Sequence, residues 1–188
     1  MRTNEQTATW RSWTGHTTEV LHLGEESGGW TADGTISGLD VQYVVRLDAH
    51  WHVRQFLLFR DLDEPDLWLA TDGSGRWGEM NGAHRPDLNG CHDIDLVATP
   101  FLRSIPMRRL ALGLAVGEST EIAVAMIDPE TLHVLPVRHR YLRTDERQWR
   151  HQTIDGGGDA REEWVVTLDE HDLPLDVPDR FRREPEPV

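Results

Sequence analysis

The chain has 188 residues and a formal net charge of −14, from 33 acidic and 19 basic residues, and every basic residue is an arginine. A chain this acidic repels nucleic acid and anionic membrane surfaces, so we expect neither as a partner. The absence of lysine excludes Schiff-base chemistry and lysine general bases, and a single cysteine excludes an internal disulfide.

Apolar residues do not gather into a membrane-spanning or signal segment. The first 13 residues lack the apolar core of a signal peptide, and no run of 18 apolar residues occurs in the chain. We therefore expect a soluble, cytoplasmic protein without stable membrane insertion.

The dominant pattern along the chain is alternation of apolar and polar side chains with a period of two. Residues 39–48 predict a half-buried strand, and residues 50–60 predict its hairpin partner. Residues 66–80 predict two short strands around the turn Asp72-Gly73-Ser74-Gly75. Further strands are predicted at residues 108–116, 120–127, 132–143, 147–154 and 162–169.

One short helix is predicted within this pattern. It begins at Thr99-Pro100, with threonine as the capping residue and proline at the first helical position, and Pro106 is expected to end it. Turns at hairpin spacing leave no room for crossover helices, which predicts antiparallel pairing. We therefore expect a mainly β protein with a single strongly curved antiparallel sheet, a half-open barrel or β-roll, and one to three short helices. It forms one β domain over residues 1–183, with a disordered tail at residues 184–188.

The segment "GCHDIDLVATPFLRSIPMRRL" (residues 90–110) contains the chemically richest set of side chains. A nucleophilic Cys91 would need a neighbouring base, but His92 would point to the opposite face of a strand, so we favour an inert, buried thiol. Histidine pairs such as His50 and His52 can chelate, yet none has the spacing of a zinc ribbon or zincin. We therefore predict no metal and no cofactor.

Asp93 and Asp95 lie two residues apart, so a strand would place both carboxylates on one face, about 7 Å apart. That spacing suits general acid–base catalysis and equally suits ion pairs with Arg108 and Arg109. We predict a cluster of these four residues. Strand alternation would let only one of the two arginines share the aspartates' side, while the other reaches the turn or a ligand cavity.

The same segment resembles the signature of a bacterial family of glycolipid-binding proteins. The matching positions are Gly90, Cys91, Asp93–Leu96, Thr99–Phe101 and Pro106–Leu110. The resemblance extends over about residues 20–183, through residues 48–54, 72–77, 139–143 and 166–183. This chain departs from the family pattern at Leu102-Arg103, where a Thr-Asn pair is usual, at His139-Arg140 and at Trp149-Arg150-His151.

The resemblance implies a curved antiparallel sheet similar to bacterial lipoprotein carriers. We therefore expect a binding protein for a glycolipid or other amphiphile in the concave face of the sheet, without catalysis, and eight tryptophans fit such a ligand. The candidate ligand-binding residues are Trp51, Arg54, Trp77, Asp93, Asp95, Arg108, Arg109 and Tyr141.

Two alternatives remain open on the sequence. One is a small-molecule enzyme that uses Asp93 and Asp95 as general acid and base. The other is a structural or partner-binding domain. A large concave apolar pocket with a few polar groups would favour the binding protein or the enzyme, and a filled core would favour the structural domain.

Overall fold

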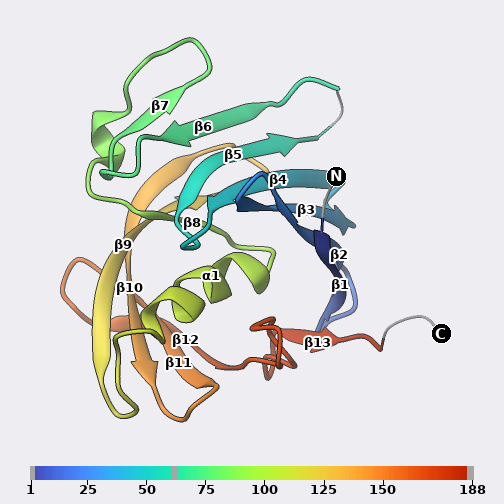
Figure 1. The fold of residues 1–188 in the computed structure, drawn as a ribbon, viewed down its shortest axis with the longest axis vertical. Coiled ribbons are helices and arrows are strands. Elements are labelled where there is room, and N and C mark those ends of the chain that lie inside the picture. Colours follow the sequence, from blue (N-terminus) through green and yellow to red (C-terminus); the bar gives the residue numbers. More distant parts are fainter. Residues whose placement is uncertain (1–2, 61–62, 186–188) are drawn as a thin grey trace.

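The computed structural model describes residues 3–60 and 63–185, and its strands form two curved sheets around one helix (Figure 1). The larger sheet has eight antiparallel strands, and its two edge strands are β13 and β7. Listed from one edge to the other, its strands are β13 (Phe181–Arg183), β1 (Thr3–Ser12), β2 (Thr18–Glu26), β3 (Gly29–Ser37), β4 (Val41–Asp48), β5 (Val53–Phe59), β6 (Leu67–Thr71) and β7 (Trp77–Glu79). Strands β1 to β7 pair in chain order, and β13 returns to lie beside β1.

The smaller sheet has five strands, in the order β12-β11-β10-β9-β8. They are β8 (Asp93–Leu96), β9 (Ser119–Ile127), β10 (Val134–Arg143), β11 (Gln148–Ile154) and β12 (Ala160–Thr167), and a short 3-10 helix, η1 (Pro86–Leu88), precedes β8. Strands β8 and β9 are parallel, because the connection between them carries the helix α1 (Phe101–Leu110). The other pairs of this sheet are antiparallel.

The predicted fold class is confirmed: the protein is mainly antiparallel β, with one α-helix and sheets that do not close into a barrel. The strands nevertheless divide between two sheets, where one was expected. The segment 108–116 accounts for part of this difference. It was predicted to be a strand, but it forms the end of α1 and the loop that follows, so the chain crosses over before β9 begins.

The helix α1 begins one residue later than predicted, at Phe101 with Pro100 as the N-cap, and continues further than predicted. The hydroxyl of Thr99 accepts a hydrogen bond from the backbone N–H of Phe101, 3.0 Å away, as a capping side chain does. Pro106 lies inside the helix and does not end it. A proline there costs about 3 kcal/mol in an isolated helix, but residues 101–107 are all buried, and this burial offsets the cost.

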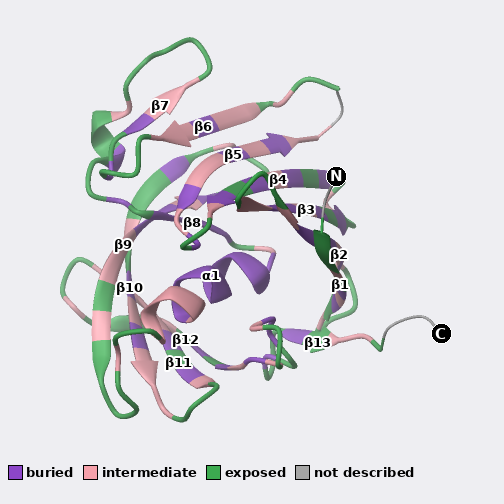
Figure 2. Ribbon diagram, viewed as in Figure 1, coloured by how far each residue is buried: buried purple, intermediate pink, exposed green. Residues whose placement is uncertain are grey.

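Helix α1 lies between the two curved sheets, and its residues 101–107 are buried while residues 108–110 are half-buried (Figure 2). The largest wholly buried apolar side chains around it include Trp10, Trp149, Tyr43 and Phe56. Among the residues that the structure describes, no helix combines the length and apolarity needed to cross a bilayer.

The C-terminal segment is ordered as far as it is described. The backbone N–H of Glu184 donates to the carbonyl of Thr9 over 2.8 Å, just beyond β13. Of the disordered tail predicted at residues 184–188, residues 186–188 lie outside the described residues.

A buried carboxyl group links the larger sheet to the start of α1. Glu19 on β2 accepts hydrogen bonds from the hydroxyls of Tyr43 and Thr99, at 2.5 and 2.7 Å. Gly34, which faces Tyr43 across the β3–β4 pair, leaves room for its ring. Burial raises the pKa of Glu19 from 4.5 to about 7, against the two hydrogen bonds, which lower it.

We predict that Glu19→Gln removes a pH dependence of stability. Because folding raises the pKa of Glu19 to about 7, its contribution is fully present below about pH 4.5 and is lost as the pH rises through about 7. At 1.36 kcal/mol per pKa unit, this corresponds to roughly 3 kcal/mol. Urea unfolding from pH 4.5 to 8 should therefore show the wild type losing roughly that much relative to the variant. Parallel pH profiles for the two proteins would contradict this assignment.

Candidate functional site

The two aspartates of β8 hold α1 through separate arginines. Arg109 binds Asp93 with two hydrogen bonds, Nη1 to Oδ1 at 3.0 Å and Nη2 to Oδ2 at 2.6 Å. Arg103 binds Asp95 through Nε, at 2.8 Å. Both aspartates and Arg103 are only 1% exposed. Six residues of helix advance about 9 Å and two residues of strand about 7 Å, so the two pairs match along adjoining elements.

Arg109 pairs with Asp93 as the predicted cluster requires, and Arg108 binds neither aspartate, in line with the expectation that only one of the two arginines shares their side. The partner of Asp95 is Arg103, which the prediction did not include. Arg103 lies within the predicted helix, but its pairing with Asp95 was not predicted, because the partners of the aspartates were sought on a strand at residues 108–116. Arg103 also binds Glu162 at 3.0 Å, and its guanidinium lies 3.7 Å from the centre of the Trp164 ring. Each of the four charged residues Asp93, Asp95, Arg103 and Arg109 therefore has a partner of opposite charge within the protein itself.

Behind Asp95 lies a group of buried aromatic side chains from the smaller sheet. The rings of His139 and His151 are wholly buried, 4.4 Å apart and nearly perpendicular. Burial lowers the pKa of both rings, so they are neutral at pH 7. Tyr141 is also wholly buried beside them, and burial raises its pKa. This candidate residue therefore lies in the interior, away from solvent.

Trp77 and Cys91 also lie in the interior. The indole N–H of Trp77 donates to the carbonyl of Cys91 over 2.8 Å, and both side chains are buried. Burial raises the pKa of the Cys91 thiol to about 11. The thiol therefore remains protonated at neutral pH, in keeping with the predicted inert role.

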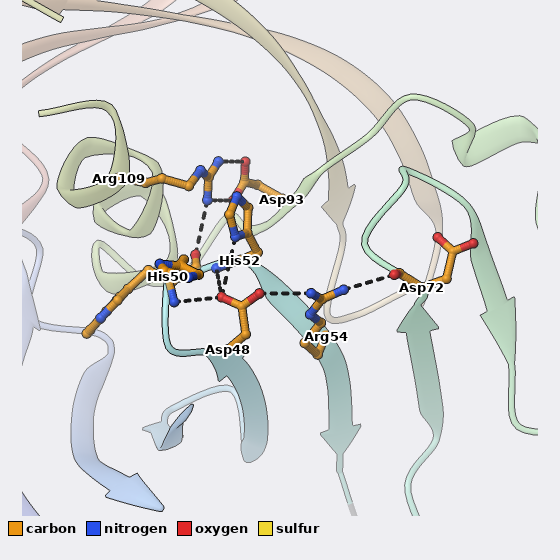
Figure 3. A network of polar contacts seen from close by, with 8 residues as sticks. Asp48, His50, His52, Arg54, Asp72, Asp93 and Arg109 are labelled. Atoms are coloured by element: carbon orange, nitrogen blue, oxygen red, sulfur yellow. Dashed lines mark hydrogen bonds and ion pairs between the residues drawn. The ribbon is translucent and has the colours of Figure 1, made fainter. Parts of the chain in front are cut away.

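A polar network holds the turn between β4 and β5 (Figure 3). One carboxylate oxygen of Asp48 accepts the backbone N–H groups of His50 and His52, at 2.9 and 3.0 Å, and the other accepts Nη2 of Arg54 at 2.9 Å. Arg54 also donates to the carbonyl of Asp72 over 2.9 Å. The predicted candidate Arg54 thus braces this turn against the β6–β7 loop.

The turn fixes Trp51 at the edge of an open cleft. Trp51 adopts a positive φ of 66°, and its carbonyl accepts Nη1 of Arg109 at 3.0 Å. Because the same guanidinium binds Asp93, the ion pair that holds α1 also holds the turn. The position of Trp51 therefore depends on that pair.

The cleft has a volume of about 580 Å³ and combines aromatic, aliphatic and arginine side chains with two carboxylates, those of Glu25 and Asp172. The rings of Trp30 and Trp51 are 5.2 Å apart and tilted by 43°. The guanidinium of Arg108 lies 4.0 Å from the Trp51 ring centre and 5.4 Å from that of Trp30. Leu112, which is 87% exposed, forms part of the rim. Of the predicted site residues, the cleft therefore unites Trp51, Arg108 and Arg109.

Trp30 belongs to this cleft and was missed by sequence reasoning. It follows the turn residues Ser27 and Gly28, which both have positive φ angles, at the start of β3. The only sequence signal was a large aromatic directly after a glycine pair. The β3–β4 register, which pairs Trp30 with Leu47, brings it beside the turn that carries Trp51. A second cleft, of about 730 Å³, is lined mainly by polar and acidic residues of β1 and of residues 169–184. It has no aromatic platform.

The described residues hold no group of three His, Cys, Asp or Glu side chains placed to bind a metal ion. The carboxylates of Asp93 and Asp95 are the best-buried acidic pair on β8, and each is bound to an arginine. The geometry of these aspartates favours a structural role over acid–base catalysis.

Comparisons with known proteins agree with this fold. The sequence profile of the family described as "Putative glycolipid-binding" matches residues 7–183, which confirms the resemblance found in the sequence. The crystal structure of a DUF1089 family protein from Pseudomonas aeruginosa is similar, with 28% sequence identity and a TM-score of 0.68 over 98% of this chain and 95% of that chain. No curated protein matches the sequence.

We predict that Arg103→Ala destabilises the protein strongly, because it leaves Asp95 buried without its partner. Breaking a buried ion pair in this way costs about 3–5 kcal/mol, a large part of the stability of a typical domain. Arg138→Ala is the matched control, since it removes an ion pair with Glu121 that is 34–49% exposed and should cost less than about 1 kcal/mol. Denaturant unfolding measures both, and equal small losses would contradict the structural role of the pair.

Proposed function

The chain belongs to the family described as "Putative glycolipid-binding", and we propose that it binds a glycolipid or similar amphiphile at the cleft formed by Trp30, Trp51 and Arg108. The observation that carries the proposal is the half-buried ring of Trp30, which packs against the buried Trp51 beside the partly exposed guanidinium of Arg108. An indole face packs against the apolar face of a sugar ring, while N–H groups bind its hydroxyls. Such a cleft presents both kinds of contact to one head group.

The loop after α1 supplies the apolar half of the proposed site. Residues 111–117 have the sequence Ala-Leu-Gly-Leu-Ala-Val-Gly, without a charge. Leu112 and Val116 are 87% and 55% exposed. Arg143 holds this loop by donating to the carbonyls of Ala111 and Leu114, at 3.1 and 2.8 Å. An alkyl chain that leaves the cleft can therefore pack along a fixed aliphatic rim.

The size and position of the cleft define how the ligand binds. A volume of about 580 Å³ falls in the usual range of small-molecule sites and suits a head group with the first part of a chain. From the sequence, we expect the ligand in the concave face of the sheet. Helix α1 packs against that face. We therefore place the ligand in the cleft beside the C-terminal end of the helix.

We predict that Trp30→Ala weakens binding of decyl glucoside, used below its micelle-forming concentration. Removing one stacking ring should raise the Kd about tenfold, equivalent to 1.4 kcal/mol. Isothermal titration calorimetry measures the affinity. Trp13→Ala is the matched control, because Trp13 is 41% exposed and lies 4.1 Å from a guanidinium, that of Arg182, outside the cleft.

The control should bind like the wild type. If Trp30→Ala also binds like the wild type, the cleft is the wrong site. If decyl glucoside and other single-chain amphiphiles all fail to bind the wild type, the proposed function is wrong.

A further inference from the structure

We propose that the head group bound in this cleft is anionic, a phosphate or carboxylate, and that Arg108 is the residue that binds it. This inference rests on the proposed function and adds the charge of the ligand to it. It follows from a comparison of the three arginines of α1, which differ in how fully their charges are compensated.

Two of the three arginines are committed to buried carboxylates. Arg103 and Arg109 bind Asp95 and Asp93 at 2.6–3.0 Å. Arg108 has weaker partners. Its Nε lies 3.4 Å from a carboxylate oxygen of Asp172, and both side chains of that pair are partly exposed.

The guanidinium of Arg108, which lines the cleft, has N–H groups that these contacts leave unused. Its Nη1 donates to the carbonyl of His171 over 3.3 Å, a long contact. Within residues 3–60 and 63–185, its Nη2 has no recorded hydrogen-bond partner. The guanidinium therefore retains donors for a ligand, whereas the other two arginines of the helix are bound to carboxylates.

The two tryptophans hold this guanidinium in a fixed place. With the Trp51 ring centre 4.0 Å away and that of Trp30 5.4 Å away, a face of the cation is covered by aromatic carbon. Its N–H donors lie in the plane of the group and point outward. A phosphate or carboxylate matches this planar set of donors better than a sugar hydroxyl does, because its hydrogen bonds are charge-assisted.

Partial burial makes an anion more favourable at this position. Burial lowers the pKa of Arg108, and only Asp172 acts in the opposite direction, so the charge is incompletely compensated. An anionic head group would supply the missing negative charge at short range. The net charge of −14 opposes the approach of anions, but at physiological ionic strength that repulsion is screened beyond about 8 Å.

The test compares decyl phosphate with decyl glucoside, two amphiphiles with the same chain, by isothermal titration calorimetry below their micelle-forming concentrations. We expect decyl phosphate to bind the wild type at least about tenfold more tightly. Arg108→Gln should weaken decyl phosphate by about tenfold or more and leave decyl glucoside within about threefold. Arg182→Gln, which removes the arginine stacked on Trp13, is the matched control and should change neither affinity.

Two further measurements keep the test decisive. Asp172→Asn removes the competing carboxylate at a position with a φ of 61°, which asparagine tolerates, and should tighten decyl phosphate binding. Inorganic phosphate alone should bind more weakly than decyl phosphate, because it lacks the chain. Equal binding of the two would assign the cleft to free anions and overturn a lipid head group.

The outcomes separate this inference from the function on which it rests. If both amphiphiles bind with equal affinity and Arg108→Gln changes neither, the anionic head group is wrong and amphiphile binding stands. If neither amphiphile binds, both proposals fall.

Discussion

Two buried arginine–aspartate pairs join α1 to the strand β8, and the arrangement of the binding cleft depends on them. Asp95 and Arg103 are both buried, and the buried Asp93 binds Arg109, which is partly exposed at the cleft. Attraction between charges is stronger at such sites than in water. Removing either partner would leave a charge without compensation. The helix is thereby fixed between the two sheets (Figure 1), and residues at its C-terminal end line the cleft.

The same interactions that hold the fold also shape the cleft. Arg109 binds Asp93 and the carbonyl of Trp51 at once, and Asp48 holds the rest of that turn (Figure 3). The preceding residue, Arg108, also lies at the cleft and stacks on Trp51. The two residues are adjacent in one helix, about 100° apart around its axis, and have different roles. Arg109 binds Asp93 and the carbonyl of Trp51, whereas Arg108 stacks on the Trp51 ring. This division lets the cleft keep a rigid aromatic wall and an arginine available to a ligand.

Sequence reasoning predicted those parts of the fold that depend on local pattern. Alternation at residues 39–48 matches β4 at Val41–Asp48, and the threonine cap marks the start of α1. The end of α1 was not predictable from Pro106, because tertiary burial outweighs a proline's local cost. The parallel β8–β9 pair depends on the crossover through α1, and the Trp30–Trp51 contact depends on the register of β3 with β4. No short window of sequence contains either. The Arg103–Asp95 pair depends on how α1 packs against β8, which the local pattern of residues 99–106 does not contain.

We propose above all that the ligand binds in the cleft beside the C-terminal end of α1 while the helix stays in place. Amide hydrogen exchange with and without saturating decyl phosphate tests it most directly, since it reports local opening along the chain. We predict unchanged protection of the α1 amides on ligand binding, together with increased protection around Trp30 and Trp51. Loss of protection along α1 on ligand binding would contradict it, because it would show that the helix leaves its aspartate partners to admit the ligand.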